Sequence, residues 1–212
     1  IPQGLSAEKV AKRIKFNFGI GSNYFMEIAK LRAARYLWSK TLTAYSIEDM
    51  DLLKMNIHSV SSTWNKSIYD AHVNLLRTTT EGMSAVLGGT DSLVLSTYNM
   101  TYQKPSEFSE RIAKNQQLLF KEESFLDKVV DPSAGSYYIE SLTNSLVQEA
   151  WKLFLEVDKK GGYLESLRQG FIQSEIELVA QQSREAMATR REIVLGSNKY
   201  PNFEEHHEEL VN

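Results

Sequence analysis

Short β-rich runs that alternate with amphipathic helices are the feature that most constrains how this chain can fold. The runs at 15–18, 57–62, 93–97 and 128–130 predict strands, and the segments 6–13, 24–38, 71–87 and 106–123 predict helices. Strands that alternate with helices are joined as parallel neighbours through crossover helices. We therefore expect an α/β protein with about four parallel strands.

The pattern changes after residue 140, where helices follow one another without strands. Two long helices are predicted at 141–160 and 164–191, separated by Gly161-Gly162. We divide the chain into residues 1–140 with the strands, a helical extension of the same domain at 141–200, and an acidic tail at 201–212 that frays. A start at Ile1 in place of Met leads us to expect a piece of a longer chain.

Periodicity leaves two architectures open. An open four-stranded parallel sheet could stand alone, and half of an eightfold barrel would show the same alternation of strands and helices. The hydrophobic share of 42% over 212 residues is enough for one sizeable core in either case.

Charge and composition exclude several classes of function. A net charge of −3 gives no field that would gather nucleic acid or anionic lipid, and no run is long enough to span a membrane. The absence of cysteine excludes a disulfide scaffold, a thiolate nucleophile and a cysteine-based zinc site. It also fits a reducing compartment, and we expect a cytoplasmic protein.

Two helices carry patterns that predict which side is buried. In the helix at 24–38, Glu27 and Lys30 fall on the face opposite the apolar residues, which predicts an exposed pair. In the helix at 71–87 one stripe carries most of the larger side chains, and we expect it to be buried. Its members are Val73, Leu76, Thr80, Met83 and Leu87.

The turn Gly19-Ile20-Gly21 follows a strand and precedes a helix, as a dinucleotide-binding loop would. Its free backbone N–H groups would suit a phosphate. The third glycine of that motif should fall at position 24, which is Tyr24. A tight strand-to-helix turn is therefore favoured over a phosphate site.

The histidines do not predict a metal site. Asp70-Ala71-His72 begins like the Asp-x-His-x-x-Gly segment that supplies an imidazole to cobalt, but Leu75 stands where the glycine should be. We expect His72 to lie on the surface near a helix start. His206 and His207 lie in the acidic tail, where a solvated segment is favoured over a metal site. His58 lies on a predicted strand and could face either the barrel interior or the helix layer.

Carboxylates and arginines near predicted strand ends are candidates for ligand contact. In parallel α/β folds the groups at the carboxyl ends of the strands face the ligand. Glu123 and Asp131 flank the strand expected at 128–130, and the loop through Gly135 has small residues that let a ligand approach. The alternative is that Asp131 caps a turn. Arg32 and Arg35 could reach an anion, or lie on a solvated helix face.

Four segments, taken in order, resemble methylmalonyl-CoA mutases. They are FGIGSNYFMEIAKLRAAR at 18–35, LRTTTEGMSAVLGG at 76–89, ERIAKNQ at 110–116 and VDPSAGSYY at 130–138. They occur in the family's order between residues 18 and 138. The resemblance implies the substrate-binding (β/α)8 TIM barrel of that family, from about its fifth strand to the helices beyond the barrel.

The resemblance also implies an activity. Members of the family use adenosylcobalamin for the radical rearrangement of methylmalonyl-CoA and succinyl-CoA, in which the cofactor performs the chemistry and the protein positions the reactants. By resemblance, a segment of three residues matches one that contacts CoA in catalytic chains: Arg32, Ala33 and Ala34. Other positions match segments that line the cofactor side: Gly89, Asp91, Glu123, Asp131 and Gly135.

Several positions depart from the catalytic pattern of the family. Catalytic chains carry Thr-Ser-Gly-Trp-Ser-Leu-Thr where this chain has SSTWNKS at 61–67. They carry Gly-Gly-Thr-Gln-Ser-Leu-His, but Asp91 replaces the glutamine and Val94 the histidine, which changes charge and removes hydrogen-bonding groups. We therefore assign no catalytic residue.

The segments 62–66 and 115–124 resemble the small, β-type subunit of bacterial heterodimeric mutases. Such a subunit keeps the fold, binds no substrate productively and pairs with a catalytic large subunit, which is our preferred interpretation. An active mutase chain and a ligand-free structural or assembly module are the alternatives. A barrel cut near its fifth strand would expose a sheet edge, so we expect self-association of the piece or another partner there.

Overall fold

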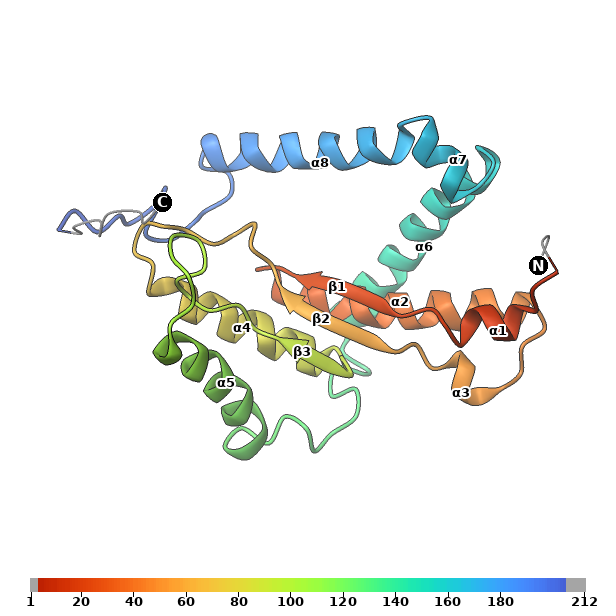
Figure 1. The fold of residues 1–212 in the computed structure, drawn as a ribbon, viewed down its shortest axis with the longest axis horizontal. Coiled ribbons are helices and arrows are strands. Elements are labelled where there is room, and N and C mark those ends of the chain that lie inside the picture. Colours follow the sequence, from red (N-terminus) through yellow and green to blue (C-terminus); the bar gives the residue numbers. More distant parts are fainter. Residues whose placement is uncertain (1–3, 205–212) are drawn as a thin grey trace.

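The computed structural model describes residues 4–204 and centres on a three-stranded parallel sheet (Figure 1). The strands are β1 (Phe16–Ile20), β2 (Ile57–Ser61) and β3 (Ser92–Val94), in the order β1-β2-β3. In the register, residue 16 lies opposite 57 and residue 58 opposite 92. The predicted α/β class with parallel strands is confirmed, and three of the four expected strands form.

Helices precede, connect and follow the strands, and all but the short one at 50–53 were predicted. They are α1 (Ala7–Ala11), α2 (Tyr24–Ala44), α3 (Met50–Leu53), α4 (Val73–Leu87) and α5 (Glu107–Glu122). Ser6 accepts a hydrogen bond from the backbone of α1, and Ser106 forms a reciprocal capping box with Ser109 at the start of α5. At the end of α4, Gly89 has a φ of +81°, a left-handed conformation that favours glycine.

One face of the sheet packs on the helices. Ile20 and Ile57 join Leu31 of α2 and Ala85 of α4 in a buried core cluster. Residues opposite each other in a parallel pair point to the same face, so the alternate row with His58 and Ser92 lies on the other side. His58 therefore faces away from the helix layer, toward the side that would be the interior of a barrel.

The buried face of α4 is polar, so the prediction that its apolar stripe is the buried side is wrong. Leu76, a member of that stripe, is 65% exposed, whereas Asn74, Thr78 and Glu81 are at most 1% exposed. These polar groups can be buried because each has hydrogen-bond partners. The prediction for α2 fails in the same way, since Glu27 is 9% exposed instead of lying in water.

The strand predicted at 128–130 does not form in the structure. Val130 is 97% exposed, and the following residue, Asp131, is held by Arg32 of α2. That contact keeps the segment beside α2 on the flank of the sheet, without an adjacent strand to pair with. Because a short strand is stable only through hydrogen bonds to a neighbour, these residues stay irregular.

The remaining described residues form helices that extend from the sheet. They are α6 (Tyr137–Lys159), α7 (Tyr163–Arg168) and α8 (Phe171–Ala188). The first half of α6 packs on α2, whereas α8 is set apart from the sheet in Figure 1. The single helix predicted at 164–191 is divided at Gly170, which has a φ of +77°.

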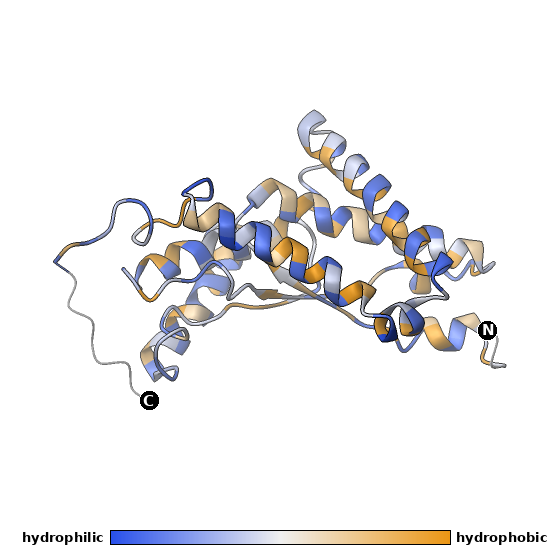
Figure 2. Cartoon of the chain, turned by 90° about the horizontal axis from the view of Figure 1, so that it is seen from above, coloured by the Kyte–Doolittle hydropathy of each residue, from blue (hydrophilic) through white to orange (hydrophobic). Residues whose placement is uncertain are grey.

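The surface of this helical part is mixed in polarity. Figure 2 shows apolar residues among polar ones along its helices, and Ile176 and Val179 of α8 are 64% and 61% exposed. No helix within residues 4–204 is long and apolar enough to cross a membrane. The division at residue 140 falls inside α6 and stays a prediction. The predicted tail from 205 onward, with its two histidines, lies outside the described residues.

Candidate functional site

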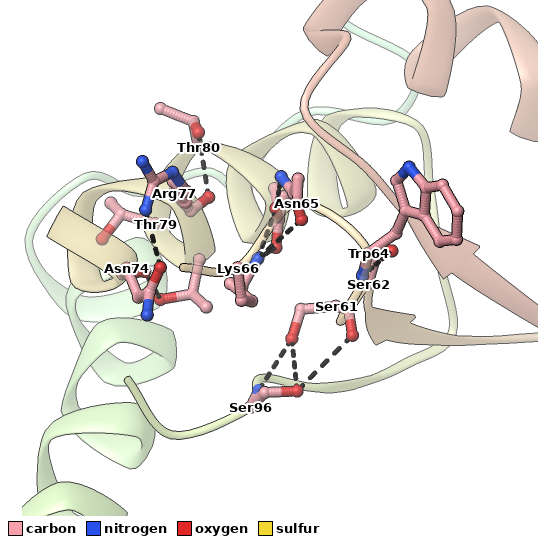
Figure 3. Close-up of polar contacts among 12 residues, drawn as sticks. Ser61, Ser62, Trp64, Asn65, Lys66, Asn74, Arg77, Thr79, Thr80 and Ser96 are labelled. Carbon is pink, nitrogen blue, oxygen red and sulfur yellow. Dashed lines mark hydrogen bonds and ion pairs between the residues drawn. The ribbon is translucent and has the colours of Figure 1, made fainter. Parts of the chain in front are cut away.

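Polar side chains gather at the carboxyl ends of β2 and β3 (Figure 3). Ser61, the last residue of β2, donates from its Oγ to Ser96 Oγ at 2.9 Å and accepts from the Ser96 backbone N–H at 2.7 Å. The two strands are thereby joined just beyond the last rung of the sheet. This edge is where parallel α/β proteins place their ligand-binding groups.

A buried ion pair lies behind this edge, between the loop after β2 and the middle of α4. Lys66 Nζ lies 2.6 and 2.7 Å from the two carboxylate oxygens of Glu81. The two side chains are 1% and 0% exposed. Asn65 Nδ2 donates to the same carboxylate at 2.7 Å, and its Oδ1 accepts from Lys66 at 3.1 Å. The three donors of the ammonium group and both oxygens of the carboxylate are therefore engaged.

Burial dominates the ionisation of this pair. It lowers the pKa of Lys66 and raises the pKa of Glu81, because each charged form loses its hydration. The partner's charge acts in the opposite direction on each group, and the carboxylate of Glu27 nearby adds to the rise at Glu81. The pair thus carries a desolvation cost that its own attraction offsets only in part.

Further hydrogen bonds tie the loops after β2 and β3 to the start of α4. Asn74 accepts from Ser67 N–H at 3.2 Å and donates to Ser67 O at 2.8 Å and to Tyr98 O at 2.9 Å. Arg77 donates to the same Asn74 oxygen at 2.7 Å. The loop that follows β2 is therefore held against α4 at two points, through Glu81 and through Asn74.

The Gly19–Gly21 turn is closed by side chains of α2. Lys30 Nζ donates to Gly19 O at 2.7 Å and forms an ion pair with Glu27. A Cβ at Gly21 would lie 3.5 Å from the Glu27 carboxylate, so the turn passes close to a negative charge. A carboxylate at this position opposes an incoming phosphate, which agrees with the tight-turn interpretation.

A cavity of about 610 Å³ lies at the opposite, amino-terminal side of the strands. Asp91 is one of its lining residues and accepts from Ile57 N–H, at the first residue of β2, at 2.8 Å. Arg32 and Arg35 of α2 and Val147 of α6 line other parts of it. Its walls therefore combine two arginines, several carboxylates and apolar side chains.

Arg32 joins α2 to α6 across this cavity. It donates to Asp131 at 3.2 Å, to Thr143 at 3.2 Å and to Glu140 at 2.8 Å. The hydrogen bond from Arg32 is the main cause that holds the pKa of Glu140 below its usual value. Arg35 donates to the carbonyl oxygens of Gly88 and Gly89, and burial lowers its pKa. Both guanidinium groups are thus engaged inside the protein.

The structure brings together only some of the residues assigned by resemblance. Those that line the amino-terminal cavity are Arg32, Gly89, Asp91 and Asp131. The others lie elsewhere. Ala33 is 4% exposed, Ala34 packs on the core, Glu123 ends α5 at the surface, and Gly135 N–H donates to Glu140. Ligand binding by these residues stays a prediction.

The buried set Asn65, Lys66 and Glu81 was not among the predicted site residues. The signal was present, because Asn65 and Lys66 are two of the departures from the catalytic pattern, but sequence alone gave them no common partner. His72 is exposed and stacks on Tyr98, with ring centroids 5.1 Å apart. Within residues 4–204, no cluster of three or more potential metal ligands forms.

Parallel strands joined by crossover helices, with polar groups gathered at the carboxyl ends, define an α/β protein built from repeated βα units. The family model described as methylmalonyl-CoA mutase matches residues 1–212, and the chain belongs to the methylmalonyl-CoA mutase family. This family assignment agrees with the resemblance seen in the sequence.

Relatives named as small subunit, as large subunit and simply as methylmalonyl-CoA mutase all match the chain. The chain is 54% identical to the methylmalonyl-CoA mutase small subunit of Porphyromonas gingivalis, over 95% of its own length and 33% of that relative. It is 38% identical to the large subunit of the same organism and 42% identical to the methylmalonyl-CoA mutase of Rhizobium meliloti, in both cases over 94% of its length and 28% of the relative. The chain thus spans about a third or less of these relatives.

The set formed by Asn65, Lys66 and Glu81 does not fit the family's cofactor, adenosylcobalamin. A large polar cofactor needs free donors and acceptors around it. Here the ammonium of Lys66, the carboxylate of Glu81 and the amide of Asn65 are bonded to one another. The described cavity lies at the other end of the strands.

Proposed function

We propose that this chain is part of an adenosylcobalamin-dependent methylmalonyl-CoA mutase, in which it belongs to the non-catalytic small subunit that supports a catalytic large subunit. The observation that carries this proposal is the identity of 54% to a small subunit, against 38% to the large subunit of the same organism. The enzyme would interconvert methylmalonyl-CoA and succinyl-CoA, with the radical chemistry supplied by the cofactor in the large subunit.

The departures from the catalytic pattern support a non-catalytic role. Asn65 and Lys66 are committed to Glu81 inside the protein. Asp91 caps the first N–H of β2, and Val94 is 47% exposed on the uncovered face of the sheet. We accordingly propose no catalytic residue in this chain.

The contacts assigned by resemblance remain proposals, and Arg32 is the one that the geometry constrains most. It would have to release Glu140 or Asp131 before it could bind a phosphate of CoA. The cofactor-side assignment has its own difficulty, because Asp91 lies at the amino end of the strands, away from the usual ligand edge.

Turnover by the full-length chain tests the proposed function. We expect the isolated chain to convert no methylmalonyl-CoA, and its addition to the large subunit to raise or stabilise turnover by that subunit. Turnover by the isolated chain would instead establish an active mutase. A chain that binds no cofactor and leaves the partner's turnover unchanged would favour a ligand-free structural module.

We further propose a cytoplasmic location, which the absence of cysteine supports, and no nucleic-acid partner, which the net charge of −3 supports. The 212-residue piece alone is expected to self-associate. Within the described residues, β1 and β3 each pair on one side only, which leaves two sheet edges open. Sedimentation of the piece as a single monomer would contradict this expectation.

A further inference from the structure

Helix α8 is attached to the rest of the chain at both of its ends. At its start it packs on α7, which contacts α6. At its end, the guanidinium of Arg184 lies 5.8 Å from the centroid of the Trp64 ring, in the loop after β2. Beyond the helix, Leu195 O accepts a hydrogen bond from Arg77 of α4. Figure 1 shows that α8 bridges these two attachments on the β1 side of the sheet, at a distance from β1.

One side of α8 is apolar, and we call it the α8 face. Since a helix has 3.6 residues per turn, four apolar residues fall on this side, whereas Leu178 lies on the opposite side. The residues of the α8 face are Ile172, Ile176, Val179 and Met187. On the same side of the helix, Ser183 and Met187 are half-buried, whereas Gln182 and Arg184 are exposed. The α8 face is therefore directed toward the rest of the chain.

The α8 face is largely uncovered within residues 4–204. No residue of this 18-residue helix is buried there, and Ile176 and Val179 are 64% and 61% exposed. Helices in proteins gain most of their stability from the packing of an apolar face, more than from the propensity of their residues. We therefore expect another part of the assembled protein to cover the α8 face.

The edge of β1 is open on the same side of the sheet. Phe16 N–H donates to Asn56 O, and Ser62 N–H donates to Ile20 O, so residues 16 and 20 of β1 face β2. Alternate residues of a parallel strand direct their N–H and C=O groups to opposite sides, so the N–H of Asn17 points away from β2. Within the described residues no strand pairs with β1 on that side. The open edge can accept one more parallel strand.

The source of that strand is best sought in the same subunit. The chain covers 33% of the small subunit to which it is 54% identical, so a subunit of that length has further residues to supply. Parallel neighbours in a sheet are joined through crossover helices of one chain. A separately folded partner would also have to pass beneath a helix that is attached at both ends, whereas part of the same chain can fold before α8 closes over it.

We propose that a further strand–helix unit of the same subunit lies between β1 and α8: its strand pairs in parallel with β1 through Asn17, and its helix packs on the α8 face. The segment α6–α8 then acts as a strap that closes over this unit and returns to the loop after β2. This arrangement goes beyond the proposed function, because it would hold for a catalytic or a non-catalytic chain.

Hydrogen exchange of the full-length subunit, alone and with the large subunit, tests this arrangement. In the isolated subunit we expect slow exchange at the Asn17 amide and along α8. Ile176→Asp should speed exchange of the α8 amides at least about tenfold, because it places a charge in the packed face. Leu178→Asp removes a side chain of the same size from the opposite side and is the matched control. It should change the exchange of α8 by less than about twofold.

The control is sharp because the two side chains differ little in the described structure. Ile176 is 64% exposed and Leu178 is 50% exposed, so without a covering unit neither substitution should matter more than the other. Equal effects of Ile176→Asp and Leu178→Asp would therefore overturn the proposal. If Ile176→Asp does not fold, Ile176→Ala and Leu178→Ala make the same comparison with a smaller expected difference.

Three other outcomes would also overturn it. Fast exchange at Asn17 and along α8 in the full-length subunit would show that nothing covers them. Protection of α8 that develops only when the large subunit is added would assign the α8 face to that partner. Protection that rises with the concentration of the isolated subunit, together with a larger mass in sedimentation, would assign it to a second copy of the chain.

Discussion

Replacing Lys66 by methionine should destabilise the protein far more than loss of an ordinary surface lysine. The substitution keeps most of the side-chain volume and removes the ammonium group. Glu81, 0% exposed, would retain only the hydrogen bond from Asn65. Breaking one partner of a buried pair leaves an uncompensated charge and costs about 3–5 kcal/mol.

Removing both charges should recover most of that loss. Lys66→Met with Glu81→Met replaces the pair by apolar side chains, and we expect a stability within about 1 kcal/mol of the parent or higher. The two sites are then strongly coupled, because the double variant loses far less stability than the sum of the two single losses. Recovery of stability by the double variant would also show that the loss in Lys66→Met comes from the unpaired charge and not from the altered side-chain shape.

The pH dependence of the stability loss gives an independent check that the charge of Glu81 causes it. Burial raises the pKa of Glu81 above the 4.5 of an unfolded chain, and loss of Lys66 raises it further. A group with a raised pKa in the fold stabilises it below the unfolded pKa and loses that contribution as pH rises through the folded value. The destabilisation of Lys66→Met should therefore shrink as the solution is made acidic toward pH 4.5.

Urea unfolding of the full-length chains, followed by circular dichroism, measures these free energies. A loss of stability below about 1 kcal/mol for Lys66→Met at neutral pH would refute the reasoning, because a buried and unpaired carboxylate has a larger desolvation cost. So would a loss that stays constant on acidification, since the carboxylate would then not be the source of the penalty.

Three further substitutions test the packing of the helices. In the parent chain the docking of α6 should weaken as pH falls below 4.5, because the guanidinium of Arg32 lowers the pKa of Glu140 and the ion pair is lost as pH falls through that lowered value. Glu140→Gln should remove this pH dependence, which hydrogen exchange of the α6 amides measures. Gly82→Ala would place a Cβ 2.6 Å from the Phe120 ring. The clash costs about 1–3 kcal/mol against a gain in helix propensity of about 1 kcal/mol, so thermal unfolding should show a net loss that Phe120→Leu relieves. Asp91→Ala leaves Ile57 N–H without its acceptor and should cost about 1–2 kcal/mol in the same assay, whereas Asp91→Asn should cost less.

The sequence predicted the elements that depend on local pattern. The helices α4 and α5 and the strands β1 and β2 were expected within a few residues, because apolar spacing and capping serines such as Ser106 act over short distances. The start of α2 was also expected, but this helix runs to Ala44 instead of ending at residue 38. The strand at 128–130 failed because a strand depends on a neighbour, and Val130 has none beside it in the structure. Local pattern carries no information on which partner is present.

The buried polar groups could not be predicted for a related reason. Helical spacing assigned Glu27 to the solvated side, and the polar residues of α4 to the side opposite the stripe that includes Leu76, because polar residues are normally exposed. For Glu81 the tertiary fold reversed this by supplying partners from the loop after β2. Glu81 meets Lys66 across 15 residues, and only the folded loop shows that the two departures at 65 and 66 have one cause.

The contact between α2 and α6 has a consequence for how the chain folds during synthesis. Arg32 and Glu140 are separated by 108 residues, so one side of α2 stays uncovered until α6 has been synthesised. At usual translation rates of about 5–20 residues per second, that interval is roughly 5–20 s. Throughout it the first βα unit is already made, yet one side of its helix has nothing to pack on. A nascent chain would thus be most vulnerable to aggregation after α2 has formed and before α6 arrives, and a chaperone that binds early segments would act in that interval.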